Sequence, residues 1–181
     1  MNIRIRAALL GLACTAGLAS HAQAADGEIT FTGTITNSTC AISVGDTTGG
    51  VAGEVKLGSV PLGSLATAGN VGGGGAFSLF IDDSDSACDL TGKKATVTFL
   101  GLSGTDGPAG QWLGVDKVTG YATNVAIQLK DAKGNEVRIS EPSAEYLQLK
   151  EPLRFTANYI ATGKATAGPA NGKAAFTVNI Q

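Results

Sequence analysis

The chain has 181 residues, which is long enough for one domain with a substantial hydrophobic core. Charged residues make up only 15% and the formal net charge is −2, so the basic surface of a nucleic-acid-binding protein is not expected. The 26 glycines, with threonine and valine recurring throughout, favour a β-rich domain with many turns over a helical one.

Residues 1–24 have the three-part pattern of a secretory signal. Arg4 and Arg6 give a positive start, residues 7–19 form an apolar core, and residues 22–24 form an Ala-x-Ala cleavage site. The apolar run is too short and too interrupted by glycine for a membrane span. A lipoprotein signal ending at Cys14 is the alternative. We therefore expect export, with a mature chain that begins at Ala25 and carries 11 Lys/Arg against 15 Asp/Glu.

Removal of the signal leaves Cys40 and Cys88 as the only cysteines. In an oxidising compartment, two cysteines are expected to form one disulfide, which stabilises the fold by about 4 kcal/mol in the chain-entropy model. A redox or metal pair would show C-x-x-C spacing or nearby histidines, but the single histidine, His21, leaves with the signal. We expect no metal, no cofactor and no catalytic site.

Residues 28–36 alternate between apolar residues and threonines, which predicts a β-strand with one buried face. The glycine on the apolar face marks a place where another backbone can approach closely. A strand at the start of the mature chain is poorly held by its own domain, so it suits pairing with the sheet edge of another subunit. The alternative is the first strand of an ordinary sandwich. The apolar face carries Ile29, Phe31, Gly33 and Ile35.

The rest of the chain predicts about ten short strands and no convincing helix. Residues 62–75 are expected to be a loop with one possible helical turn, ending in four glycines that lack the Gly-Lys-Ser/Thr ending of a phosphate loop. The acidic run 82–89 fits a solvated loop better than a calcium loop. The expected strands are 39–44, 54–57, 76–81, 95–102, 111–115, 124–130, 137–140, 146–149, 152–161 and 174–181.

Short strands with regular turns predict an antiparallel β-sandwich. The strand at the C-terminus has no later neighbour in the sequence, and its edge is covered either by an internal strand or by a partner from elsewhere. Trp112, the single tryptophan, is more readily placed in the core or at its rim than on a sugar-binding platform. The pattern of residues leads no further than this.

The mature chain as a whole resembles the structural pilins of chaperone–usher fimbriae, and in particular the shaft subunits of type 1 fimbriae. Four blocks carry the resemblance. Residues 27–40 (GEITFTGTITNSTC) resemble the family's donor strand and first cysteine, and residues 95–101 (ATVTFLG) the strand after the second cysteine. Residues 123–134 (TNVAIQLKDAKG) are similar to the central hairpin, and residues 157–181 to the C-terminal signature with its Tyr-x-Ala-Thr-Gly run.

The resemblance implies an incomplete immunoglobulin-like antiparallel sandwich over residues 37–181. This sandwich lacks its last strand and is completed by donor-strand exchange with the N-terminal extension, residues 25–36, of another subunit. The implied donor residues are Ile29, Phe31, Gly33 and Ile35. The implied groove and chaperone-recognition residues are Gly168, Phe176, Val178 and Ile180, the last standing where the family commonly has an aromatic residue.

The implied function is that of a structural subunit that polymerises into a surface fibre for cell adhesion. The implied partners are neighbouring pilin subunits, a periplasmic chaperone and an outer-membrane usher, and the route is export through the periplasm to the cell surface. The alternative is a minor adaptor or adhesive subunit of the same kind of fimbria. An enzyme is disfavoured because the mature chain has no histidine and no compact acid–base cluster.

Overall fold

The computed structural model describes residues 40–45 and 53–181. The predicted signal (1–24) and the predicted donor strand with Ile29, Phe31, Gly33 and Ile35 lie outside the described residues. The described part contains strands, one short 3-10 helix (η1) and loops. Their bounds are β1 Ala41–Gly45, η1 Leu62–Leu65, β2 Val71–Asp82, β3 Ala95–Gly101, β4 Thr105–Asp106, β5 Trp112–Leu113, β6 Val125–Asp131, β7 Glu136–Val137, β8 Leu153–Ala161 and β9 Ala174–Ile180.

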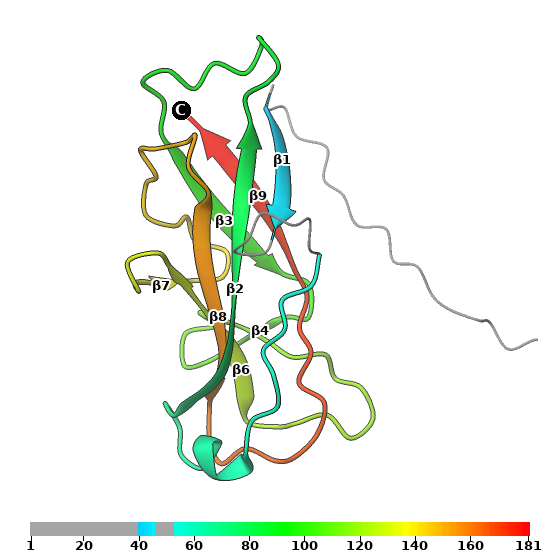
Figure 1. Ribbon diagram of the computed structural model, residues 1–181. Coiled ribbons are helices and arrows are strands. Elements are labelled where there is room, and N and C mark those ends of the chain that lie inside the picture. The colour runs from blue at the N-terminus through cyan, green and yellow to red at the C-terminus, as the bar shows by residue number, and fades with distance from the viewer. Residues whose placement is uncertain (1–39, 46–52) are drawn as a thin grey trace, which may run out of the picture. The chain divides into compact units, whose positions relative to one another are not determined.

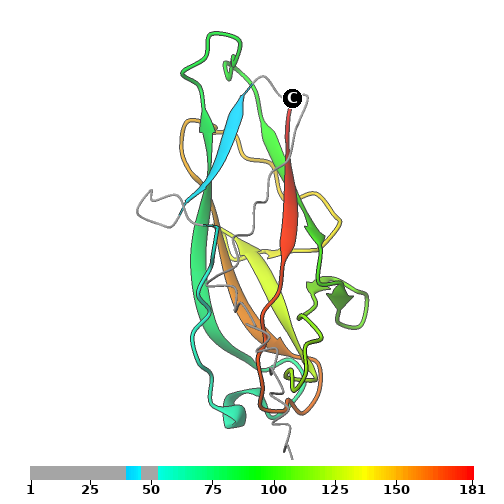
Figure 2. The ribbon, with the colours of Figure 1, turned by 90° about the vertical axis from the view of Figure 1, so that its right-hand side faces the viewer.

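The strands form two antiparallel sheets, as the sequence predicts (Figure 1). The larger sheet has the order β1-β2-β8-β6-β5-β4, with β7 paired to β6. The smaller sheet contains β3 and β9 alone. Within residues 40–45 and 53–181, both β1 and β9 therefore have a strand on one side only. Figure 2 shows β1 and β9 on opposite sides, with β6 and β8 visible between them.

Aromatic rings join the two sheets. Phe99 of β3 packs edge-on against Phe155 of β8 at 5.1 Å and against Phe77 of β2 at 5.9 Å. Phe77 and Phe155 stack on each other at 5.4 Å, and all three side chains are buried. Such pairs add roughly 0.5–1.5 kcal/mol each beyond their burial. The alternating residues of β2, β3 and β8 that point inward thus build one core between the sheets.

The four glycines at 72–75 are part of β2, so the prediction of a flexible loop there was wrong. A bulge between Gly72 and Gly75 bends the strand, and residues 53–60 pass directly over it. A Cβ on Gly75 would lie 2.7 Å from the Lys56 carbonyl oxygen, and one on Gly73 would lie 2.5 Å from that of Leu57. The glycines are there because a second backbone lies where side chains would be.

Two predicted strands are absent from the sheets. Residues 54–57 run beside β2, and the described residues show one backbone hydrogen bond between them, from the Gly74 N–H to the Leu57 carbonyl at 3.0 Å. Residues 146–149 make only an isolated bridge between Tyr146 and Ala95. Both segments follow a sheet edge without extending the ladder. The predicted helical turn is present as η1.

The predicted disulfide is present between Cys40 and Cys88, with their Cα atoms 4.8 Å apart. It ties the residue before β1 to the loop between β2 and β3, so β1 is fixed to β2 both by its ladder and by a covalent bond. No helix in the part of the chain that the structure describes is long and apolar enough to cross a membrane.

Candidate functional site

The outer edge of β9 carries backbone groups that no other described residue pairs. Lys94 and Gln181 exchange both of their backbone hydrogen bonds, at 3.0 and 2.9 Å. Because hydrogen-bonded and non-hydrogen-bonded pairs alternate along an antiparallel ladder, the N–H and C=O groups of alternate β9 residues point away from β3. Those residues are Phe176, Val178 and Ile180, opposite Phe99, Val97 and Ala95.

The equivalent groups of β3 are satisfied. On its far side, the Ala95 N–H donates to the Tyr146 carbonyl at 3.0 Å, and the Val97 and Phe99 carbonyls accept from the N–H groups of Ser143 and Ser140. Segment 140–146 therefore covers the edge of β3. Among the described residues, β9 has no such cover, which leaves a polar backbone edge of the kind that accepts another strand.

Apolar side chains border this open edge on both sides. Phe176 and Ile180 of β9 are only half-buried although they face the core, whereas Val178 between them is 5% exposed. Half-buried aliphatic side chains also come from β1 and from segment 53–60, which lie on the side of the domain opposite β9 in Figure 2. These are Ile42, Val44, Val55, Leu57 and Val60. We call the space between these two rows of side chains the β9 groove.

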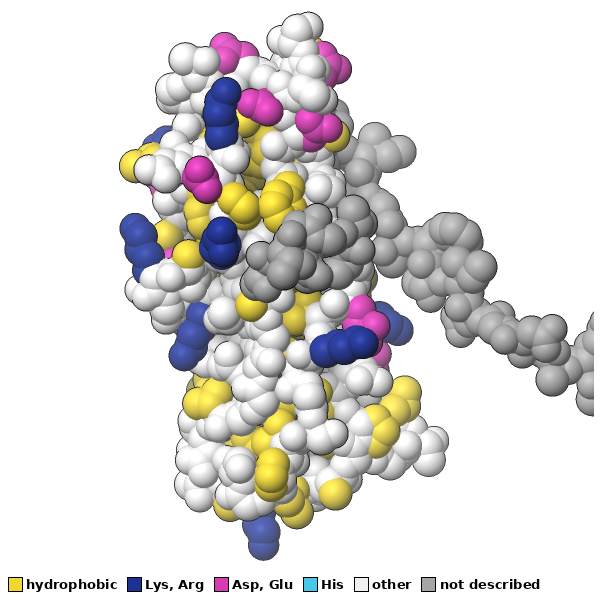
Figure 3. All heavy atoms as spheres, in the orientation of Figure 1, with side chains coloured by type: hydrophobic (Ala, Val, Ile, Leu, Met, Phe, Trp, Pro, Cys, Tyr) yellow, Lys and Arg dark blue, Asp and Glu magenta, His cyan; other side chains and the backbone are white. Residues whose placement is uncertain are grey.

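A pocket of about 380 Å³ lies next to the segment that leads into β9. Two loops, 58–65 and 165–171, provide its walls, and Ala122, Val125 and Tyr159 also line it. Burial raises the pKa of the Tyr159 phenol, which is consistent with a ring held among apolar neighbours. Figure 3 shows hydrophobic side chains gathered at the end of the molecule where η1 lies. We call this cavity the end pocket.

Gly168 lies in the wall of the end pocket, away from the inward side chains of β9. Its φ is +155°, and a Cβ there would lie 2.2 Å from the Gly120 carbonyl oxygen and 2.7 Å from the Ala122 nitrogen. The next residue, Pro169, accepts a hydrogen bond from the Ala122 N–H at 2.9 Å. A side chain at Gly168 would therefore push the wall of the pocket off residues 120–122.

The structure thus gathers three of the implied groove residues, Phe176, Val178 and Ile180, on one strand face, and it places Gly168 at one end of the groove. Sequence reasoning missed the opposite wall. Val55 and Leu57 alternate within a short predicted strand, and this alternation was the available signal for them. Val60 lies in a loop and gave no signal. Tyr159 lies in a predicted strand, but nothing in the sequence marked it as part of a pocket.

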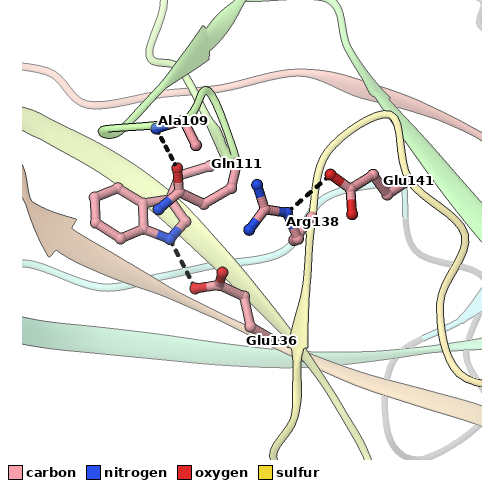
Figure 4. Close-up of polar contacts among 6 residues, drawn as sticks. Ala109, Gln111, Glu136, Arg138 and Glu141 are labelled. Carbon is pink, nitrogen blue, oxygen red and sulfur yellow. Dashed lines mark hydrogen bonds and ion pairs between the residues drawn. The ribbon is translucent and has the colours of Figure 1, made fainter.

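The polar clusters elsewhere in the described residues hold the fold together. Trp112 is half-buried at the sheet surface, where its indole N–H donates to Glu136 Oε2 at 2.8 Å (Figure 4). Gln128 Nε2 donates to the same oxygen at 2.7 Å. Gly107 lies against the indole ring, since a Cβ there would be 2.6 Å from Cε3. This places Trp112 at the rim of the fold.

The carboxylate of Asp131 holds the hairpin between β6 and β7. It accepts hydrogen bonds from the N–H groups of Lys133 and Asn135 at 2.8 and 2.9 Å, and from Asn135 Nδ2 at 3.0 Å. Burial acts to raise the pKa of Asp131, but these hydrogen bonds outweigh it and the pKa is lowered. The part of the chain that the structure describes holds no group of three or more residues suited to binding a metal ion.

Comparison with known proteins gives a consistent family. The family model described as "Fimbrial protein" matches residues 29–181. The type-1 fimbrial protein A chain of Escherichia coli (strain K12) is 31% identical over 176 residues, covering 95% of this chain and 93% of that protein. The fimbrial subunit type 1 of Klebsiella pneumoniae is 33% identical over 181 residues, with the same two coverages.

Solved structures agree on the fold. The P pilus rod subunit PapA superposes with a TM-score of 0.57 at 19% identity, covering 78% of this chain and 99% of that one. A subunit from the structure of a chaperone–usher pilus rod also gives a TM-score of 0.57, at 21% identity over 87% of this chain and 96% of that one. The family match over residues 29–181 and the two fimbrial relatives establish that the chain belongs to the fimbrial protein family.

Proposed function

We propose that the chain is a structural subunit that polymerises by donor-strand exchange, with residues 25–36 of one copy filling the β9 groove of the next. The observation that carries this proposal is the outer edge of β9, where the backbone of Phe176, Val178 and Ile180 meets no described partner. An added strand would pair this edge and cover Phe176 and Ile180. Burial of each apolar side chain contributes roughly 1.5–3 kcal/mol before the cost of ordering the strand.

The direction of the donated strand follows from the sheets. Every strand pair in the described residues is antiparallel, and antiparallel pairs are the commoner kind. In an antiparallel arrangement, the start of the donor strand lies beside the C-terminal end of β9. Its later residues lie beside Ala174, close to the end pocket. Ile35 is therefore the donor side chain that reaches toward the end pocket.

Complementary size selects the register. The apolar donor residues recur every second position, as do the inward residues of β9. A match of Gly33 to Phe176 places the smallest donor residue against the largest groove residue, which avoids both overpacking and a void. A shift by two residues in one direction would instead oppose Phe31 to Phe176. The register with Gly33 at Phe176 also places Phe31 at Val178, Ile29 at Ile180 and Ile35 at Ala174.

Before assembly, the same edge needs temporary cover, because an apolar groove beside an unpaired strand is prone to aggregation. We propose that a periplasmic chaperone lends a strand to β9 and that an outer-membrane usher exchanges it for the donor strand during export to the cell surface. The disulfide and the predicted signal at residues 1–24 fit an exported protein.

Cysteine cross-linking tests the exchange and its register together. Thr177 is exposed on β9, and the proposed register places Thr32 of the incoming strand opposite it, in a non-hydrogen-bonded pair whose Cα atoms are close enough for a disulfide. We expect fibres carrying Thr32→Cys and Thr177→Cys to give ladders of linked subunits that collapse on reduction. The controls replace Thr32→Cys with Thr30→Cys or Thr34→Cys, which lie one register step away.

If disulfide-linked ladders form only with Thr30→Cys or only with Thr34→Cys, the proposed register is wrong but donor-strand exchange still holds. If assembled fibres link through none of the three pairs, the donor strand does not occupy the β9 groove and the proposal is wrong.

A further inference from the structure

The sequence contains one asparagine that is followed by glycine, Asn171, and this pair lies in the loop that leads into β9. Asn171 is exposed and lines the end pocket. Its backbone carbonyl accepts a hydrogen bond from the Asp116 N–H at 2.6 Å, which anchors the loop beside residues 114–117. A chemically reactive dipeptide is thus built into the wall of the cavity.

Asparagine before glycine loses its side-chain amide without an enzyme. The backbone nitrogen of the glycine attacks the side-chain carbonyl carbon, a C–N bond forms, and the amide nitrogen leaves as ammonia. Water then opens the cyclic imide at one of its two carbonyls and gives aspartate or isoaspartate. Glycine favours the attack because it has no Cβ to shield its nitrogen.

Both reacting groups at this position are available in the structure. No described residue makes a hydrogen bond to the Asn171 side chain, and the Gly172 N–H donates to no described residue. Two other asparagines are protected by side-chain hydrogen bonds. Asn124 Nδ2 donates to the Lys164 carbonyl at 2.9 Å, and Asn135 Nδ2 donates to Asp131, and both precede residues with larger side chains.

We propose that Asn171 is a site of spontaneous deamidation on the open subunit, and that the donor strand suppresses the reaction by covering the end pocket. The second half of this proposal rests on donor-strand exchange, whereas the first half does not. Covering the pocket fixes the loop and removes water from the wall, whereas the cyclic intermediate needs backbone movement to form and water to open.

The product would impair the groove. Either product places a carboxylate at the rim of a pocket lined with apolar side chains, where burial of an unpaired charge is unfavourable. Isoaspartate also adds a methylene group to the backbone between the Asn171 anchor and β9. Lys173, which already pairs with Asp116 at 3.6 Å, is the cation next to the new charge. Modified subunits should therefore accept a donor strand more slowly than unmodified ones.

Asn70 is a matched internal control. It is exposed, its side chain has no described hydrogen-bond partner, and its carbonyl accepts a hydrogen bond from the Ala161 N–H at 2.9 Å. It precedes Val71, whose branched side chain shields the nitrogen. It also lies outside the residues that line the end pocket.

The experiment incubates unassembled full-length subunit and assembled fibres in parallel, in mildly alkaline buffer at body temperature, and maps both by peptide mass spectrometry. We expect aspartate and isoaspartate to accumulate at Asn171 over days in the unassembled subunit, several-fold faster than at Asn70, and to be strongly reduced in fibres. Asn171→Gln should remove the product, because the longer side chain would have to form a larger and slower-forming ring.

An Asn171 that stays intact in the unassembled subunit, or that reacts no faster than Asn70, overturns the site. Equal rates in subunit and fibres overturn the protection while leaving the site in place. Asn171→Asp tests the consequence directly, with Asn70→Asp as its matched control. We expect the first variant to take up a peptide of residues 25–36 several-fold more slowly than the second, and equal uptake overturns the proposed effect on the groove.

Discussion

Phe176 of β9 lies directly opposite Phe99 of β3, with the ring centroids 6.4 Å apart, yet Phe99 is 3% exposed and Phe176 is only half-buried. Phe99 has Phe77 and Phe155 packed against it from the larger sheet. Both rings stand at paired positions of the same two-stranded sheet, so the difference arises because β9 has no neighbour on its outer side among the described residues. This contrast locates the incomplete part of the core.

Leucine in place of Gly33 should block or slow fibre growth. In the proposed register, this side chain would be forced against Phe176, and overpacking of this kind costs about 1–3 kcal/mol or more. Fibre yield from cells expressing Gly33→Leu is the measurement. The subunit's own groove is unchanged, so its chaperone complex should form normally. Thr34→Leu adds the same bulk on the opposite face of the strand and should assemble. If Gly33→Leu gives normal fibres, a small residue is not required at this position of the donor strand.

Alanine at Gly168 should weaken donor-strand binding through the pocket wall. The added Cβ would meet the Gly120 carbonyl oxygen at 2.2 Å and the Ala122 nitrogen at 2.7 Å, so the loop has to move. We expect Gly168→Ala to lower the free energy of unfolding of the subunit with bound donor peptide by roughly 1–3 kcal/mol, measured by urea unfolding. Gly63→Ala is the control, since a Cβ on Gly63 meets nothing within 4 Å. Equal stability of the two variants would show that the wall does not depend on Gly168.

The Asp131 hairpin should be sensitive to acid. Because the pKa of Asp131 is lowered in the folded state, its contribution is fully present above the pKa of an unfolded aspartate, about 3.9, and is lost as the pH falls through the folded value. Asp131→Asn keeps one acceptor oxygen and should cost about 1–2 kcal/mol at neutral pH. The difference in the free energy of unfolding between wild type and Asp131→Asn, measured with urea, should then become smaller in acid. A gap that stays constant with pH would contradict the assignment.

The sequence predicted the elements with clear alternation and failed where neighbours decide the structure. β3, β6, β8 and β9 match their predicted ranges closely because apolar residues recur at every second position of each. The glycines at 72–75 were misassigned, since their place in β2 depends on the backbone of residues 53–60 that crosses them. Local preference alone cannot reveal a contact of that kind.

Part of the candidate site could likewise be predicted from the sequence, and part could not. The inward face of β9 was readable from Phe176, Val178 and Ile180, which alternate in the sequence. The end pocket was not, because its walls come from two loops that are distant in the chain and its floor includes Tyr159 of the central strand β8. The resemblance singled out Gly168, and the structure supplies a physical reason for a glycine there in its contact with residues 120–122.

Donor-strand exchange requires that a strand from another subunit complete the fold, and a peptide titration tests this requirement. A chain that begins at Asn37 keeps the groove and lacks the donor strand, so alone it should be unstable or aggregate. A peptide of residues 27–37 should raise its melting temperature with increasing concentration, stabilising it by about 2.7 kcal/mol at one hundred times the Kd. The control peptide, with Ile29, Phe31 and Ile35 changed to Ser, should have no effect. A truncated chain that is a stable monomer, indifferent to both peptides, would mean that the fold is complete by itself and would contradict the account.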